Sequence, residues 1–299
     1  MSSDTGARRS VEDDSTDSLL DDLVPYKYQR QGRKWAWRIG LFVSMIVVLF
    51  PIYWMLVTSI TPSRDLFSVP TPLFPAEPTF QAYAQVMQTD IPLWFFNTTY
   101  LSVGVVTLTT AAATLGGYGL ARLDIPHKKT FARAILFGYM FPPILLSIPL
   151  FIFWRQLGIL NSIPGVIFAT MAATLPFSLW LMWQFFQTVP YSLEESAIVS
   201  GSTRFRAFID VALPMAKPGM IAVAIYSFAL SWGAFTIPTI LLIDSEKWVL
   251  VQGLYRFTVQ ESVKWSQIMA AATLMVLPTI LFVYFLQKYI LRGFQASQV

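Results

Sequence analysis

Few residues in this chain have the side chains and spacing that catalysis requires. His127 is the only histidine and lies in a short basic loop. A nucleophilic triad needs a buried, oriented histidine, and a histidine metal site needs more than one. There is no cysteine, which excludes disulfides and thiolate metal sites. The phosphate-cradling pattern G-x-x-x-x-G-K-[ST] is also absent, since residues 32–34 and 201–203 do not fit it. We therefore expect no enzymatic activity and no cofactor or metal site in this chain.

A polar loop over Gln187–Gly219 has a pattern that suits a mechanical role instead. Ser192 is expected to cap a helix, with Glu195 in capping-box register. Gly201 then allows a tight break, and Thr203–Ala212 is expected to form a second short helix. The predicted apolar face of that helix consists of Phe205, Phe208, Ile209 and Ala212. This pattern predicts a small, stiff knob beside the membrane, and an ordinary amphipathic connector on the bilayer is the alternative.

Composition places most of the chain in a membrane. Of its 299 residues, 55% are hydrophobic and 13% are charged, whereas a soluble domain carries about 25% charged residues. Six apolar stretches are long enough to cross a hydrocarbon core as helices of about 20 residues. They are Trp37–Ile60, Asn97–Ala121, Ala134–Trp154, Val166–Phe186, Met220–Ile243 and Ile268–Ile290. The sequence thus predicts an all-α, polytopic membrane protein with six transmembrane helices.

Charge placement predicts the orientation and excludes some kinds of transport. None of the six stretches contains Asp or Glu, and the only Lys or Arg residues in them are Arg38, at the edge of the first, and Lys288, near the end of the sixth. This argues against a proton-coupled transporter and a voltage sensor, which need charges in mid-membrane. Of the 21 Lys and Arg residues, 16 fall on the side of the termini and the Glu195 loop, and 5 on the other. Because cytoplasmic loops are rich in Lys and Arg, both termini are expected to be cytoplasmic.

The expected organisation follows the apolar stretches along the chain. Its parts are a disordered acidic and basic cytoplasmic tail (1–36), a first transmembrane helix (37–60), an extracytoplasmic loop (61–92), a core of five helices (93–288) that includes the loop 190–219, and a cytoplasmic tail (289–299). The beginning of the tail is acidic and poor in apolar residues, which is typical of disorder. Internal prolines in the third to sixth stretches predict kinked helices.

The polar loop resembles the "EAA…G…I-x-L-P" loop of type I ABC importer permeases. The matching positions are Glu195, Ala197, Gly201, Val211, Leu213 and Pro214. Further stretches are similar to the carbohydrate-uptake branch of that family, the maltose-type subunit with six spans. They are Trp94–Thr98, Gly117–Arg122, Phe141–Leu150, Leu175–Leu181 and Phe285–Gly293. The resemblance covers about Phe50 to Gly293.

The resemblance implies a permease subunit in a prokaryotic plasma membrane. Such a subunit pairs with a second, homologous permease and receives sugar from an extracytoplasmic solute-binding protein. Two cytoplasmic ATPase subunits bind the ATP and magnesium, and the Glu195 loop would dock into them. The resemblance therefore implies that this chain forms half of a path for a mono- or oligosaccharide.

A few residues are candidates for contact with the sugar, although packing roles compete for each. Aromatic faces and polar side chains on the fourth and fifth stretches are Trp180, Trp183, Gln184, Ser231, Trp232 and Thr236. The sequence departs from the family where it reads Trp232–Phe235, since a small polar residue and an acid often follow this tryptophan. Ser200 stands where an acid is frequent before Gly201, and the tail after Gly293 is short and atypical.

Two other functions remain open at this point. An ABC permease for another small solute would share the loop, although a cationic cargo is expected to need acids within the membrane. A channel or membrane scaffold without ATP coupling would leave the loop free to vary.

Overall fold

The computed structural model describes residues 26–69, 73–140, 142–258 and 264–296, which form helices and no strand. The chain divides into two compact units, residues 1–55 and 56–299. The first unit consists, where described, of most of helix α2 (Tyr26–Ile60), an exposed and largely apolar helix. The sequence predicts a disordered tail through residue 36, whereas α2 begins at Tyr26, so this expectation is wrong for residues 26–36. The remainder of the predicted tail lies outside the described residues.

The second unit contains the helices that build the candidate site. In chain order they are α3 (Gln81–Val86), α4 (Ile91–Arg122), α5 (Lys128–Tyr139), α6 (Pro143–Gln156), α7 (Ile163–Thr188), α8 (Tyr191–Val199), α9 (Arg204–Ala207), the π-helix η1 (Phe208–Ala212), α10 (Leu213–Met215), α11 (Lys217–Trp232), α12 (Thr236–Leu241), the 3-10 helix η2 (Ser245–Lys247), α13 (Leu250–Thr258) and α14 (Trp265–Ala296).

Helix α4 is the central element of this unit. It packs along both α7 and α11, and α14 packs along α11. Gly117 permits the close crossing of α4 and α7, because a Cβ atom there would lie 2.8 Å from the backbone nitrogen of Trp183. Small residues that let helix backbones approach closely are the usual packing device in membranes. The glycines and alanines of α4 therefore serve the scaffold.

Four described helices are long and apolar enough to cross a membrane: Trp37–Ile60, Ile91–Arg122, Ile163–Thr188 and Trp265–Phe285. The bent pair Arg204–Met215 and Lys217–Trp232, which meet at 69°, would make a fifth. Four of the six predicted spans are thus present as continuous helices.

The other two predicted spans are each divided into shorter helices. The stretch Ala134–Trp154 separates into α5 and α6 around Pro142, and Met220–Ile243 separates into α11 and α12 at Gly233–Phe235. Proline lacks a backbone N–H and clashes with the preceding turn, so the consecutive prolines Pro142 and Pro143 account for the first break, whereas the second break contains no proline. The expectation of kinked but continuous helices is wrong for these two stretches.

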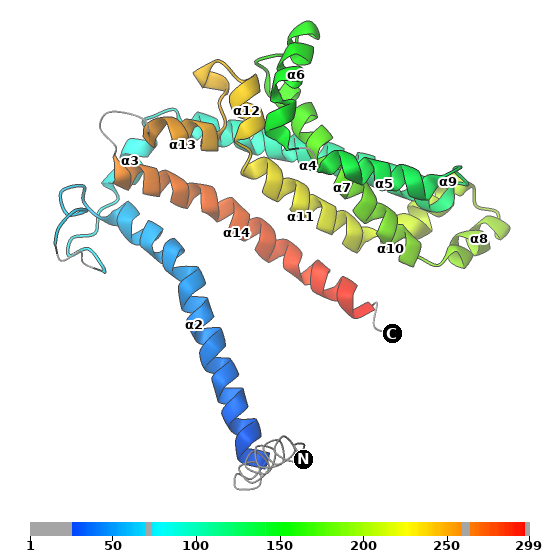
Figure 1. The fold of residues 1–299 in the computed structure, drawn as a ribbon, viewed down its shortest axis with the longest axis horizontal. Coiled ribbons are helices and arrows are strands. Elements are labelled where there is room, and N and C mark those ends of the chain that lie inside the picture. The colour runs from blue at the N-terminus through cyan, green and yellow to red at the C-terminus, as the bar shows by residue number, and fades with distance from the viewer. Residues whose placement is uncertain (1–25, 70–72, 141, 259–263, 297–299) are drawn as a thin grey trace, which may run out of the picture. The chain divides into compact units, whose positions relative to one another are not determined.

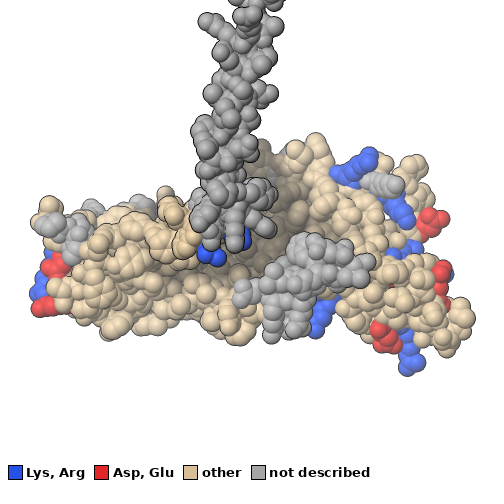
Figure 2. All heavy atoms as spheres, turned by 90° about the horizontal axis from the view of Figure 1, so that it is seen from below, with Lys and Arg blue, Asp and Glu red and all other residues tan. Residues whose placement is uncertain are grey.

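The two ends of the second unit are polar and its middle is apolar. Helices α8, α9 and α10 lie at one end, and α3 and α13 lie at the other (Figure 1). On the face drawn in Figure 2, most charged side chains gather near these ends, and the surface between them is largely uncharged apart from a few Lys and Arg atoms near its middle. Such a surface is what a helical bundle presents to a hydrocarbon layer.

Candidate functional site

The polar loop folds as a chain of short helices between α7 and α11. Helix α8 follows Pro190, and α9 follows Thr203, whose hydroxyl accepts a hydrogen bond from the backbone nitrogen of Arg206 at 3.3 Å. The second helix predicted over Thr203–Ala212 is therefore present, with a π-helical second half. The predicted capping box is wrong, because Ser192 lies inside α8 and Pro190 occupies the capping position.

Gly201 makes the sharp turn between α8 and α9. Its φ of +97° lies in the left-handed region, which side chains with a Cβ disfavour. Two hydrogen bonds close the turn, from the Gly201 nitrogen to the Ile198 oxygen at 2.9 Å and from the Ser202 nitrogen to the Ala197 oxygen at 3.0 Å. Glycine at this position therefore fixes the direction in which α8 leaves the rest of the loop.

A buried ion pair attaches α8 to the end of α4. The Glu194 carboxylate, which is 2% exposed, accepts a hydrogen bond from Arg122 Nε at 2.6 Å. Tyr118 donates its hydroxyl hydrogen to the same carboxylate at 2.9 Å, and Arg122 also donates to the Val189 carbonyl at 2.9 Å. The guanidinium further lies 5.4 Å from the ring centre of Tyr191. Each member of the pair thus has a charged partner and hydrogen bonds, as buried charged side chains in proteins generally do.

Apolar packing holds the second half of the loop against the same helices. Phe208 and Ala212 are buried with Met182 and Phe186 of α7. The ring of Phe208 lies 4.5 Å from that of Tyr118, measured between centroids. The predicted apolar face is confirmed for these two residues but not for Phe205, which is 69% exposed, or Ile209, which is 41% exposed.

The loop therefore has an anchored side and an outward side. Among the six motif residues, Glu195, Gly201 and Pro214 are exposed, while Ala197, Val211 and Leu213 are partly buried. Val199 is 88% exposed and lies on the same short helix as Glu195. The motif residues are spread over consecutive short elements: Glu195 and Ala197 on α8, Val211 on η1, and Leu213 and Pro214 on α10, with Gly201 at the turn.

Sequence reasoning missed Glu194, Arg122 and Tyr118, which hold this element in place. Two signals point to them in retrospect. Glu194 immediately precedes the motif acid, and Tyr118 and Arg122 are four residues apart, so they share one face of α4.

The residues predicted to contact a sugar fall into different environments. Ser231 donates to the Phe228 carbonyl at 3.2 Å, and the indole of Trp232 donates to the Met275 carbonyl at 3.0 Å, so both side chains are buried between helices. Trp180, Trp183 and Gln184 are partly buried on α7. Thr236 alone among the six lines the cavity described next.

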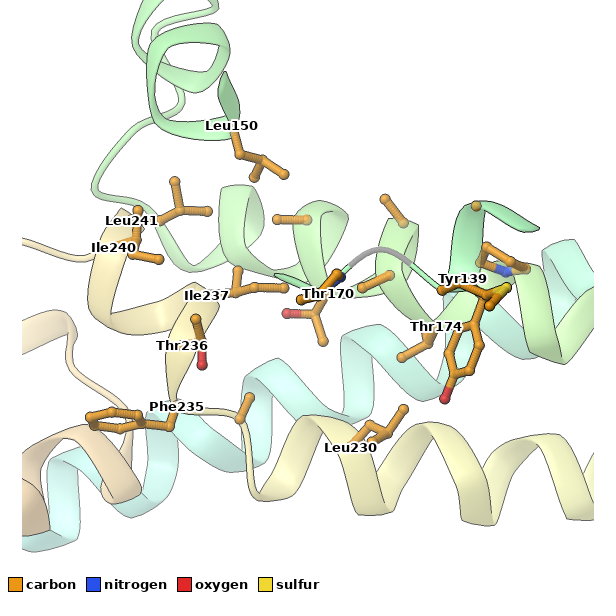
Figure 3. A pocket seen from close by; sticks show the side chains of 18 residues that line it. Tyr139, Leu150, Thr170, Thr174, Leu230, Phe235, Thr236, Ile237, Ile240 and Leu241 are labelled. Carbon is orange, nitrogen blue, oxygen red and sulfur yellow. The ribbon is translucent and has the colours of Figure 1, made fainter. Parts of the chain in front are cut away.

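A cavity of about 460 Å³ lies where the two divided spans are interrupted. Its walls come from the end of α5, Pro142 before α6, Leu150 in the middle of α6, the middle of α7, and the junction of α11 with α12 (Figure 3). Non-helical backbone at membrane depth is tolerated where it is buried in protein or lines a cavity. The two helix breaks are thus explained by what they enclose.

The opposite end of α4 binds the segment between α12 and α13. The Trp94 indole donates to the Ser245 carbonyl at 2.8 Å, and the Asn97 amide donates to the carbonyls of Glu246 and Trp248 at 2.8 and 3.0 Å. These contacts explain why Trp and Asn occur in Trp94–Thr98, a stretch that resembles the family but whose function the sequence did not indicate. Helix α4 therefore links the polar loop at one end to this segment at the other.

A second set of hydrogen bonds closes the same end of the unit. Asn161 donates its amide hydrogen to the Asp244 carboxylate at 2.6 Å and accepts hydrogen bonds from the backbone nitrogens of Ile243 and Asp244. Hydrogen bonds from Asn161 and Lys247 lower the pKa of Asp244, which is fully ionised at neutral pH. No group of acidic or histidine side chains that could hold a metal ion occurs among the described residues.

The fold and the anchored loop define a class, that of polytopic helical membrane transport subunits. The chain belongs to the family of binding-protein-dependent transport system inner membrane components, whose family model matches residues 113–295. The family match confirms the resemblance to ABC importer permeases.

Three similar proteins illustrate the family. The diacetylchitobiose uptake system permease protein NgcG of Streptomyces coelicolor is 32% identical over 244 residues, which cover 81% of this chain and 80% of that protein. The trehalose/maltose transport system permease protein MalG of Thermococcus litoralis is 28% identical over 264 residues, covering 87% and 94%. A chain of a bacterial ABC transporter that imports the acidic polysaccharide alginate superposes with a TM-score of 0.77 at 23% identity, covering 89% of this chain and 98% of that one. This last likeness shows that the fold is shared.

Proposed function

We propose that this chain is one of two permease subunits in an ATP-driven importer for a neutral sugar. Relatives that match most of its length are named as permeases for diacetylchitobiose and for trehalose or maltose. The family description, a binding-protein-dependent transport system, supports delivery of the sugar by an extracytoplasmic solute-binding protein.

The observation that carries the proposal is the anchored loop. The buried Glu194 ties α8 to α4, while the neighbouring Glu195 and the turn at Gly201 face outward. A partner that moves this surface therefore also moves α4, because the ion pair between Arg122 and Glu194 connects the two. In the proposed complex the partner is one of two ATPase subunits, which bind the ATP and magnesium.

We further infer that the chain crosses a prokaryotic plasma membrane six times, with both termini in the cytoplasm. Helices α5 and α6 together form the third crossing, and α11 with α12 forms the fifth. The excess of Lys and Arg on the loop side supports this orientation. The helix breaks then lie within the membrane, where irregular backbone is tolerated only if it is buried in protein or lines a cavity.

Uptake of a sugar panel into proteoliposomes tests this function. The complex is purified through this chain together with its second permease, its ATPase and its solute-binding protein. The panel consists of diacetylchitobiose, trehalose, maltose and an alginate oligosaccharide, with the amino acid histidine as a cargo of another class. We expect ATP-dependent uptake of at least one neutral sugar that requires the binding protein.

Vesicles whose complex lacks this chain are the control, and they should accumulate no sugar. Uptake of histidine alone, or sugar entry that needs neither ATP nor the binding protein, would contradict the proposal.

A further inference from the structure

The segment between α2 and α3 exposes large apolar side chains outside any membrane span. Phe67, Val69 and Phe74 are 76%, 94% and 59% exposed. They follow the apolar stretch Trp37–Ile60, which is long enough to cross a membrane, and they lie beyond its end. Lipid covers exposed apolar side chains within a span, but the exposure of these three needs another explanation, because such residues mark a contact with a membrane or a protein.

The two ends of this segment are fastened together. The backbone nitrogen of Thr79 donates to the Ile60 carbonyl at 2.8 Å, and Arg64 Nη2 lies 2.6 Å from Glu77 Oε2. Arg64, Asp65 and Glu77 are the only charged residues between positions 61 and 79. Residues 61–79 therefore form a closed loop with its charges near its two ends, and the three apolar residues lie between those charges in the sequence.

The composition of the loop suits the headgroup layer of a membrane. Irregular backbone cannot face hydrocarbon, where its N–H groups would have no partner, but headgroups and water supply partners in the interfacial layer. Five of the residues in 61–79 are prolines, which have no backbone N–H to satisfy. Phenylalanine and leucine side chains are common on surfaces that lie in this layer. The loop also begins directly after Ile60, where the apolar stretch ends.

A protein that docks only during transport fits these residues less well than lipid does. The interfaces of such transient complexes are about as apolar as the rest of a protein surface. A docking protein would also leave three large apolar side chains in water each time it departed, whereas lipid is always present. A second permease subunit is the other permanent neighbour, and the experiment below distinguishes it from lipid.

We propose that loop 61–79 inserts Phe67, Val69 and Phe74 into the headgroup region of the adjacent leaflet. The hydrogen bond between Thr79 and Ile60 then fixes the level of this end of α2 in the membrane. Because no cationic side chain lies among the three residues, insertion depends on apolar burial and not on anionic lipid. The inference goes beyond sugar transport, since it requires only that α2 crosses a membrane.

Spin labels on single cysteines test the position of the loop, since the chain has no cysteine of its own. Nitroxides at Phe67→Cys, Val69→Cys and Phe74→Cys are compared with one at Glu246→Cys, an exposed charged position before α13. The complex, with cysteine-free partner subunits, is reconstituted in phosphatidylcholine vesicles. We expect the three loop labels to collide more often with oxygen, which concentrates in lipid, and less often with a water-soluble nickel chelate than the Glu246 label does. Adding phosphatidylglycerol should change neither collision rate.

A paired substitution tests whether the apolar side chains hold the loop in place. In the labelled Val69→Cys protein, Phe67→Ser together with Phe74→Ser should raise the collision rate with the nickel chelate. Phe131→Ser, at an exposed position of α5, is the matched control and should leave the label unchanged. The melting temperature in detergent should stay the same for all these variants, because the replaced side chains are exposed.

Three results would each overturn the inference. Nickel collisions as frequent as at Glu246 would place the loop in water. Few collisions with either reagent would show that a protein, such as a second permease, covers the loop. A fall in both collision rates on addition of the solute-binding protein would make the loop a docking surface. Failure of sugar uptake bears only on the proposed function, because the labels report their position without transport.

Discussion

Replacing Arg122 with alanine is expected to disconnect the coupling loop from helix α4. The substitution leaves the Glu194 carboxylate buried without its charged partner, and breaking a buried ion pair in this way costs about 3–5 kcal/mol. The hydrogen bond to the Val189 carbonyl is lost with it. We expect sugar-stimulated ATP hydrolysis to fall at least about 10-fold and the loop to become more accessible to protease. Hydrogen exchange of residues 190–203 would measure the same loosening directly.

Two further variants separate the ion pair from a general loss of charge. Arg133→Ala removes an exposed cation from α5 and should behave as the wild type. The double variant Arg122→Met, Glu194→Leu replaces both charges by apolar groups, which is often neutral or stabilising, and should restore protection of the loop. An Arg122→Ala complex with wild-type protection and hydrolysis would show that the loop is held by other contacts.

Gly253→Ala is expected to destabilise the end of the unit opposite the coupling loop. A Cβ atom at Gly253 would lie 2.0 Å from Cε3 of Trp94. The indole cannot retreat easily, because it donates to the Ser245 carbonyl at 2.8 Å and packs between Trp248 and Phe257. Overpacking of this kind costs about 1–3 kcal/mol. We expect the melting temperature of the purified protein to fall by about 2 °C or more.

Gly40→Ala is a matched control, since a Cβ there would meet nothing within 4 Å. Its melting temperature should stay the same or rise, because alanine favours the helix over glycine. The double variant Gly253→Ala, Trp94→Phe provides the missing space and should recover part of the loss. If Gly253→Ala melted at the wild-type temperature, the ring of Trp94 would not be fixed as the hydrogen bond to Ser245 implies.

These two predictions concern opposite ends of one helix. Arg122 is the last residue of α4 and contacts the polar loop, whereas Trp94 and Asn97 lie in its first two turns and contact the segment between α12 and α13. A helix of 32 residues extends about 48 Å, longer than the roughly 30 Å hydrocarbon core. We expect α4 to move as a rigid rod, so that displacement of the loop is transmitted to the far side of the unit.

Sequence reasoning predicted the features that depend on long, regular patterns. Apolar stretches predicted the four continuous spans, and the spacing from Glu195 to Pro214 identified the loop. The family match confirms the class of protein that this loop indicated.

The failures have a common physical cause, which is that the outcome depended on contacts distant in sequence. Pro142 permits either a kink or a break, and the choice depends on whether neighbouring helices can enclose the interrupted backbone. Which of Glu194 and Glu195 is buried depends on the rotation of α8, which Arg122 sets from 72 residues away. Ser192 matched a capping pattern, but α8 begins before it, directly after Pro190.

The sugar-contact candidates illustrate the same dependence. Trp232 is an aromatic residue of the fifth stretch that suits a sugar contact by type, yet its indole donates a hydrogen bond to the Met275 carbonyl on α14. These roles stay predictions until uptake is measured.

The most direct test of the central claim is sugar-stimulated ATP hydrolysis by the complex purified through this chain. Glu195→Lys reverses an exposed charge on the outward side of the loop, and Gly201→Asp places a side chain at a φ of +97°. Asp124→Asn, at an exposed position in the loop between α4 and α5, is the control. We predict that an ATPase co-purifies with the wild type. Both loop variants should lower sugar-stimulated ATP hydrolysis at least about 10-fold or release the ATPase from the complex. The control variant should hydrolyse ATP at the wild-type rate and retain the ATPase. Co-purification of no ATPase, or hydrolysis that both loop variants leave unchanged, would contradict the central claim.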